Sequence, residues 1–298
     1  MRKGFAILCI MLGCLACITA CSKDSKDTIT NVTKSDKDDY YSCQYGDINR
    51  KYILHIPEGI KENVPLVLLM PGYAQSAEEC QRYTEMDDKA DKYGYVVAYV
   101  QGESDPYDKS SAAGWNSGIK DKGNDDTGFL VALAHYLQET YHCSSEYTFA
   151  VGFSNGAFMS YRLACEASDT FRAVASVCGS MTNGAWHARQ EKTSVGILQI
   201  NGTLDDVVPL NSSSYVHYGD APAIDGVIEY WNTANGLDKE ETKTLSERVT
   251  AHCYSGKDTD TQVWYVEIQD GRHGWPNKDL TGIDTSELIL EYFNLYVK

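Results

Sequence analysis

Apolar residues along this chain switch repeatedly between the two-residue spacing of a strand and the 3.6-residue spacing of a helix. The run Val64–Met70 (VPLVLLM) is continuously apolar, as expected of a strand that is buried on both faces. The segment Asp126–Tyr141 carries apolar residues at helical spacing instead. This alternation predicts an α/β fold, a mostly parallel central sheet with helices on both faces in a single domain.

The same spacing assigns an element to much of the remaining chain. We expect strands at Arg50–Pro57, Val64–Met70, Tyr95–Val100, Tyr147–Phe153, Phe171–Val177, Val195–Ile200 and Gln262–Ile268. We expect helices at Ser76–Tyr93, Asp126–Tyr141, Asn155–Cys165, Ile224–Asn232 and Thr285–Val297. The first strand alternates apolar and polar residues, which favours an antiparallel position.

The N-terminus has the composition of an export signal. Arg2 and Lys3 precede an uncharged run, Gly4–Ala20, which is short for a membrane-spanning helix of about 20 residues. The run ends Ile18-Thr19-Ala20-Cys21, which resembles a bacterial lipobox. The resemblance implies that residues 1–20 are a signal peptide, cleaved before Cys21, and that Cys21 is lipidated. An ordinary cleaved signal with soluble secretion is the alternative.

Residues 21–39 are polar and rich in Lys, Asp, Ser and Thr, so we expect a flexible, lipidated tether before a catalytic domain at residues 40–298. The Lys- and Asp-rich stretch resembles the surface-export signals of some Gram-negative gut bacteria. We therefore expect an exported lipoprotein at the outer membrane, with the cell surface as a further location and a periplasmic or secreted protein as the alternative. Membrane contact is expected through the lipid anchor only.

Charge excludes one class of partner. The chain has 26 basic and 42 acidic residues, a formal net charge of −16. A nucleic-acid binder needs clustered Lys and Arg to neutralise phosphates, so we expect no nucleic-acid partner. Beyond residue 21, the spacing of the cysteines contains no C-x-x-C pair for a zinc site.

The chain has ten cysteines, four of which lie within the first 21 residues. The other six are Cys43, Cys80, Cys143, Cys165, Cys178 and Cys253. An even number in an oxidising compartment suggests disulfides, although the sequence does not choose among the possible pairings.

A candidate nucleophile lies between a predicted strand and a predicted helix. Gly152-Phe153-Ser154-Asn155-Gly156 is a G-x-S-x-G sequence at this turn. Such an elbow exposes the serine hydroxyl, and the backbone N–H of Asn155 would start the helix, where a developing oxyanion is favoured. The alternative is an ordinary turn in which Ser154 caps the helix.

A serine nucleophile needs a histidine base and an orienting acid, which follow it in the chain order Ser, Asp/Glu, His. His273 follows the last predicted strand in a Gly- and Pro-containing loop, at the edge where active sites of open α/β sheets lie. His252 lies in a polar stretch and is expected to be solvated. Asp205 and Asp206 follow another strand, and by spacing alone either could reach the imidazole.

Together these motifs resemble the α/β-hydrolase superfamily. Within it they are similar to the secreted poly(3-hydroxybutyrate) depolymerase-like and feruloyl esterase-like proteins of carbohydrate esterase family 1. The matching motifs are G-F-S-N-G-A at 152–157, N-D-D-T-G-F at 124–129, N-G-T-L-D-D-V-V-P at 201–209 and H-G-W-P at 273–276. The resemblance places the triad acid at Asp205.

The resemblance also implies a second oxyanion donor, the backbone N–H of Tyr73. The family often has Leu-His-Gly before this position, whereas this chain has Met70-Pro71-Gly72-Tyr73. The histidine that commonly buttresses the loop is therefore absent, which leaves open how the loop is held.

We therefore expect a serine esterase that forms an acyl-enzyme and needs no metal or cofactor. The substrate would be a small ester or an ester-decorated polysaccharide such as feruloylated or acetylated xylan. Trp115 and Trp275 are candidate substrate-binding aromatics, and for each of them packing in the core is the alternative. The alternatives are a poly(3-hydroxybutyrate)-type polyester depolymerase, a serine peptidase and a non-catalytic surface glycan-binding lipoprotein.

Overall fold

A computed structural model describes residues 27–104, 111–119, 122–189, 194–211 and 222–298. The expected signal peptide and the lipidation site Cys21 lie outside these residues. Within the described ranges, no helix combines the length and the apolar character that a bilayer-spanning helix requires.

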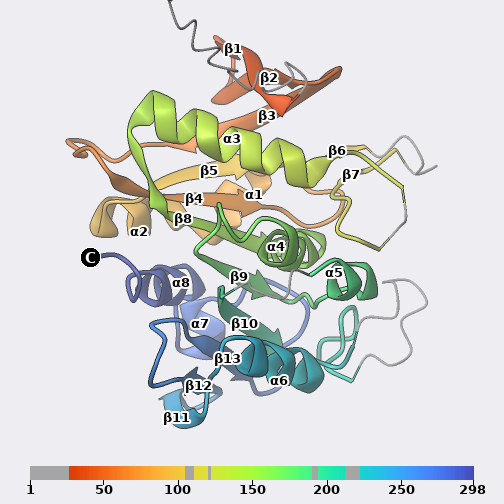
Figure 1. Cartoon of the computed structure of the whole chain (residues 1–298), viewed down its shortest axis with the longest axis vertical. Coiled ribbons are helices and arrows are strands. Elements are labelled where there is room, and N and C mark those ends of the chain that lie inside the picture. Colours follow the sequence, from red (N-terminus) through yellow and green to blue (C-terminus); the bar gives the residue numbers. More distant parts are fainter. Residues whose placement is uncertain (1–26, 105–110, 120–121, 190–193, 212–221) are drawn as a thin grey trace, which may run out of the picture.

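The centre of the structure is an 11-stranded sheet (Figure 1). In spatial order its strands are β1 (Ile29–Lys34), β2 (Tyr40–Tyr45), β3 (Ile48–His55), β5 (Val96–Val100), β4 (Val64–Met70), β8 (Cys143–Phe153), β9 (Ala173–Val177), β10 (Gly196–Gly202), β13 (Val263–Ile268), β12 (Val249–Ser255) and β11 (Lys239–Ser246). The six strands from β5 to β13 are parallel to one another, and the outer strands on both sides are antiparallel. The prediction of a mostly parallel sheet is confirmed.

Helices cover both faces of this sheet. They are α1 (Ala77–Thr84), α2 (Met86–Tyr93), α3 (Asp126–Tyr141), α4 (Asn155–Glu166), α5 (Asn183–Ala188), α6 (Ile224–Ala234), α7 (Lys278–Thr281) and α8 (Thr285–Phe293). Residues of α3, α4 and α6 join one hydrophobic cluster, and residues of α1, α2 and α8 join another. The sheet therefore separates two apolar layers, and helices lie on both of its sides in Figure 1.

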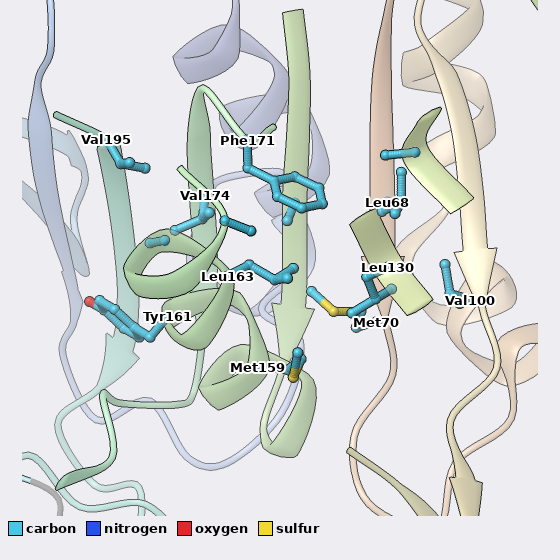
Figure 2. Close-up of a cluster of buried hydrophobic side chains, with 14 of the residues drawn as sticks. Leu68, Met70, Val100, Leu130, Met159, Tyr161, Leu163, Phe171, Val174 and Val195 are labelled. Atoms are coloured by element: carbon cyan, nitrogen blue, oxygen red, sulfur yellow. The ribbon is translucent and has the colours of Figure 1, made fainter. Parts of the chain in front are cut away.

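Strand β4 shows why its run is continuously apolar. Leu68 and Met70 belong to the cluster under α3 and α4, whereas Val67 and Leu69 belong to the cluster on the opposite face. Figure 2 shows Leu68 and Met70 beside Leu130 of α3. Because alternate side chains of a strand point to opposite faces, a strand covered on both sides needs apolar residues throughout.

The expected tether boundary at residue 39 is wrong, because residues 29–34 form strand β1 and pair with β2. Ile29 and Val32 pack against the core although they are three residues apart. A register shift occurs between Thr30 and Thr33, and Asn31 has a φ of 52°. We infer that this irregularity brings both apolar side chains to one face, which a search for strict alternation does not detect.

Further parts of the chain differ from expectation, two of them for clear reasons. The helix expected at Ser76–Tyr93 is two helices, because Glu85 adopts a left-handed conformation with φ 49° and redirects the chain. The C-terminal antiparallel pair β11–β12 was not expected. Strand β11 is mostly exposed and polar, so it has no apolar pattern by which a sequence search would find it.

The expected disulfides are also contradicted. All six cysteines of the folded body, at positions 43, 80, 143, 165, 178 and 253, are free thiols, and all six are buried. They behave as small apolar core residues, a common role for unpaired cysteine.

Candidate active site

Ser154 lies at a strained turn between β8 and α4. Its backbone has φ 51° and ψ −114°, which is a rarely populated conformation for a residue with a side chain. Its side chain makes no capping hydrogen bond to the helix. The interpretation of Ser154 as a helix cap is therefore excluded, and its hydroxyl is directed to another partner.

The glycines of the elbow allow β8, α4 and β4 to approach closely. A Cβ atom added to Gly152 would lie 2.0 Å from the carbonyl oxygen of Gly156. A Cβ atom added to Gly156 would lie 2.2 Å from the carbonyl oxygen of Met70. Both distances are far below van der Waals contact, so the sharp turn at Ser154 requires glycine at these positions.

The structure brings together three residues that are far apart in sequence. His273 Nε2 lies 3.0 Å from Ser154 Oγ, and His273 Nδ1 lies 2.8 Å from Asp205 Oδ2. With the proton on Nδ1, the imidazole donates to the carboxylate and its Nε2 accepts the hydrogen bond of the serine hydroxyl. This is the geometry that activates a serine for nucleophilic attack.

The loops after β10 and β13 place the acid and the base at the carboxyl edge of the sheet. Asp205 Oδ1 accepts hydrogen bonds from the backbone N–H groups of Val207 (2.9 Å) and Val208 (2.8 Å). Its side chain is completely buried, whereas Asp206 is exposed. The ambiguity that spacing left between the two aspartates is thus resolved by geometry, and Asp205 is the partner of His273.

The loop that follows β4 lies beside the serine. The Gly72 N–H donates to Gln75 Oε1 at 2.8 Å, and a Cβ atom on Gly72 would lie 3.3 Å from Ser154 Cβ. Tyr73 follows directly. Asn155 is the first residue of α4, where backbone N–H groups have no partner within the helix. These positions agree with the expected oxyanion donors, whose role remains a proposal.

Of the two possibilities for Trp115, a substrate-binding surface and packing in the core, the structure shows the second. Its side chain is part of the hydrophobic core, and the residue is only 6% exposed. Its indole Nε1 donates a hydrogen bond of 3.0 Å to the carbonyl oxygen of Pro71. The Gly/Ser-rich composition of its surroundings favours an open loop, but this bond and the burial hold the ring in the core, against the loop that follows β4.

Trp275 is half-buried close to the triad. Its ring lies 6.4 Å from that of Phe153 and 6.0 Å from that of Tyr83, between ring centroids, and its Nε1 donates to Ser286 Oγ at 3.3 Å. Phe153 in turn lies 5.2 Å from the imidazole of His273. Trp275 thus packs against Phe153, which in turn packs against the imidazole of His273. A direct contact between Trp275 and the substrate stays a prediction. The other candidate, His252, pairs with Glu240 on β11 and is not part of the site.

Cys178 is a residue of the site that the sequence did not reveal. It follows β9 with a φ of 52°, is fully buried, and its Sγ donates to the carbonyl oxygen of Gly274 at 3.2 Å. Cys178, Asp205 and His273 form the one cluster of potential metal ligands that the described part of the chain contains. The side chains of all three residues already form the hydrogen bonds described above. Burial raises the pKa of the Cys178 thiol to about 12.

Comparisons with known proteins agree with this geometry. Residues 50–230 match the sequence profile of the family described as Esterase PHB depolymerase. The chain is 28% identical over 251 residues to NocK, a candidate esterase of Nocardia uniformis subsp. tsuyamanensis, covering 76% of this chain and 71% of that protein. It is 29% identical over 162 residues to feruloyl esterase C of Emericella nidulans, which covers 54% of this chain and only 57% of that enzyme.

Solved structures share the fold at low sequence identity. The acetyl xylan esterase from Aspergillus awamori has a TM-score of 0.61 at 13% identity, covering 83% of this chain and 94% of that one. An S-formylglutathione hydrolase from Agrobacterium tumefaciens has a TM-score of 0.57 at 10% identity, covering 90% and 99%. The fold is that of the α/β-hydrolases, and because the family profile matches residues 50–230, which is more than half of the chain, this chain belongs to the Esterase PHB depolymerase family.

Proposed function

We propose that the chain hydrolyses feruloyl or acetyl esters of plant cell-wall polysaccharide through an acyl-enzyme on Ser154. The observation that carries this proposal is the continuous hydrogen-bonded chain from Ser154 through His273 to the buried carboxylate of Asp205. A serine hydroxyl is a weak nucleophile without such a base, and the chain supplies both the base and its orienting acid.

The reaction would follow the acid–base steps of a serine hydrolase. Ser154 Oγ attacks the ester carbonyl while His273 Nε2 takes its proton, and Asp205 stabilises the resulting imidazolium. His273 then returns the proton to the leaving alcohol as the C–O bond breaks, which leaves the acyl group on Ser154. A water molecule repeats the sequence and releases the acid. The backbone N–H groups of Tyr73 and Asn155 would bind the oxyanion in both steps.

Exposed apolar side chains next to the triad support an aromatic acyl group. Tyr73 is 48% exposed and follows the glycine that lies against Ser154. Leu204 is 48% exposed and Val207 is 40% exposed, on either side of the acid. Large apolar side chains left in water beside a reactive serine offer area to a flat apolar group such as a feruloyl ring. The similarity to feruloyl esterase C points the same way.

The substrate class is tested by measuring kcat/KM for methyl ferulate, acetylated xylan and a short hydroxybutyrate oligomer side by side. We expect one of the first two to exceed the oligomer by at least about tenfold, a difference of about 1.4 kcal/mol in transition-state binding. Preference for the oligomer would favour the polyester depolymerase. A peptide amide is assayed alongside the three esters, and preference for it would favour the peptidase. A protein that turns over none of them and is not labelled by a fluorophosphonate would be a non-catalytic glycan-binding protein.

We further propose that the protein is exported and held in a membrane by lipid on Cys21. The support is the uncharged run Gly4–Ala20, which ends in Ile18-Thr19-Ala20 and is followed by Cys21 and a polar stretch. Cells grown with labelled palmitate should incorporate the label into the wild-type chain and not into a Cys21→Ser chain. Release of unlabelled protein into the medium would instead support soluble secretion.

A further inference from the structure

We infer that the segment Ala113–Asn116 is a brace that sets the distance between the two oxyanion donors, with Trp115 as its central positioning residue. The inference rests on the proposed function, because it takes the backbone N–H groups of Tyr73 and Asn155 as those donors. The segment precedes α3 in the chain and contains the short strand β7 (Ala113–Gly114). It contacts both donor-bearing loops at once.

On one side, the segment grips the loop that carries Tyr73. The indole Nε1 of Trp115 donates to the carbonyl oxygen of Pro71 at 3.0 Å. The N–H of Ala74 donates to the carbonyl oxygen of Ala113 at 2.7 Å. These two bonds lie before and after Tyr73 along the chain, so they fix the peptide groups on both sides of the proposed donor. In this chain these two bonds hold the Tyr73 loop, which in the family is commonly held by a histidine that this chain lacks.

On the other side, the segment grips the start of α4. The backbone N–H of Trp115 donates to Asn155 Oδ1 at 2.7 Å, and Asn155 Nδ2 donates back to the carbonyl oxygen of Trp115 at 3.3 Å. Asn155 is only 8% exposed, so this two-way amide pairing is shielded from water. Because the paired residue is also the first of the helix, its backbone N–H moves with the brace.

The brace is itself anchored away from the site. The N–H of Asn116 donates to Asp126 Oδ2 at 2.7 Å, and Arg162 Nη1 donates to the carbonyl oxygen of Asn116 at 2.6 Å. Asp126 is held by a fully buried ion pair with Arg50, whose Nη2 lies 2.7 Å from Asp126 Oδ1. The D-D-T-G-F helix start thus has a use beyond capping α3, which is to fix this segment.

Close contacts also explain why position 114, inside the brace, is a glycine. A Cβ atom added to Gly114 would lie 3.0 Å from the ring of Tyr73 and 3.1 Å from Asn155 Oδ1. Both neighbours belong to the two gripped loops, so Gly114 sits where the loops converge. Any larger residue would press the donors apart.

Oxyanion stabilisation depends on donors that are already in place, because donors that must reorganise lose their advantage. Removing the indole N–H should therefore loosen the Tyr73 loop in the free enzyme without touching the triad. A misplacement of about 1 Å can cost about 100-fold in rate. The loss should appear in the transition state, where the oxyanion exists, and not in ground-state binding.

The test compares Trp115→Phe with Trp231→Phe in the full-length protein. Trp231 is a matched control, because it is as buried as Trp115 but its indole Nε1 has no hydrogen-bond partner. For Trp115→Phe we expect kcat for methyl ferulate to fall by about 10- to 100-fold with KM nearly unchanged. Trp231→Phe should stay within about twofold of the wild type in both constants.

The binding affinity of phenylboronic acid gives a second measurement, which would not change if Trp115 only stabilised the fold. Ser154 Oγ adds to its boron while His273 takes the proton, which gives a tetrahedral anion with an oxygen in the oxyanion site. We expect its affinity for Trp115→Phe to fall by the same factor as kcat. The pH profile of kcat/KM should keep its shape, because the triad is unchanged.

Two results would overturn the inference. One is a Trp115→Phe enzyme whose kcat and boronate affinity match those of Trp231→Phe. The other is a loss of kcat that comes with a shifted pH profile, since that places the damage in the triad. If Trp115→Phe does not fold, Asn155→Ala removes the grip from the other side and should show the same signature. Failure of the proposed function looks different: the wild-type protein would not turn over the ester, or its turnover would survive Ser154→Ala.

Discussion

His273 Nδ1 lies 2.8 Å from Asp205 Oδ2, and the side chain of Asp205 is completely buried. The second carboxylate oxygen accepts two backbone N–H groups, so the acid has a single orientation. A buried, fully hydrogen-bonded carboxylate can hold one tautomer of the imidazole and stabilise its charged form. Its neighbour Asp206 is exposed and does not orient the imidazole.

The two aspartates should therefore differ sharply under substitution. Asp205→Asn should lower kcat for a soluble ester by about 1,000- to 10,000-fold, because the amide favours the wrong tautomer of His273. Asp206→Asn serves as the control and should leave kcat nearly unchanged. If Asp206→Asn caused the larger loss, the assignment of the acid would be wrong.

Close packing at the elbow predicts opposite effects for two helical glycines. Gly156→Ala should lower the free energy of unfolding by about 1–3 kcal/mol and reduce kcat, because its Cβ would lie 2.2 Å from the Met70 carbonyl oxygen. Gly226→Ala lies within α6 with nothing within 4 Å of the added Cβ, so it should stabilise by about 0.5–1 kcal/mol. Urea unfolding of both variants measures the difference, and equal effects would contradict the tight approach of α4 to β4.

The six buried cysteines should stay reduced and unreactive in the native protein. Burial raises the pKa of the Cys80 thiol to about 12, so at neutral pH it is protonated and a poor nucleophile. Iodoacetamide should modify positions 43, 80, 143, 165, 178 and 253 only after unfolding, and without added reductant. Peptide mapping reads this directly, and a disulfide-linked pair of peptides would refute it.

Strand β1 makes the N-terminal boundary testable. A chain that begins at residue 40 lacks β1 and should lose about 1–3 kcal/mol of unfolding free energy relative to a chain that begins at residue 27, because Ile29 and Val32 no longer cover the core. Denaturant unfolding of the two chains is the measurement. Identical stabilities would mean that residues 27–39 contribute no packing.

The parallel centre of the sheet was predictable because its strands are buried on both faces. Runs such as Val64–Met70 are then apolar throughout, and the helix Asp126–Tyr141 agrees with its predicted bounds. The edges were harder to predict. Strand β1 needs an irregular register to direct its apolar residues inward. Strand β11 has almost no apolar residues, so no apolar pattern marks it in the sequence.

The site divides in a similar way. Ser154 and His273 could be predicted because each occupies a turn whose glycines and neighbouring strands are visible in the sequence. The choice between Asp205 and Asp206 depends on which side chain turns inward, which spacing does not encode. The sequence likewise does not show whether Trp115 lies in the core or at the cleft, since its burial and its bond to the Pro71 carbonyl oxygen depend on distant parts of the chain.

Covalent labelling of the nucleophile tests the central claim most directly. A fluorophosphonate incubated with the full-length protein should give one adduct, on the peptide that contains Ser154, with a yield that rises in step with the loss of esterase activity. Ser154→Ala should take up no label and have no measurable turnover while it keeps the wild-type fold. Labelling at another residue together with loss of activity, or an active Ser154→Ala protein, would contradict the account.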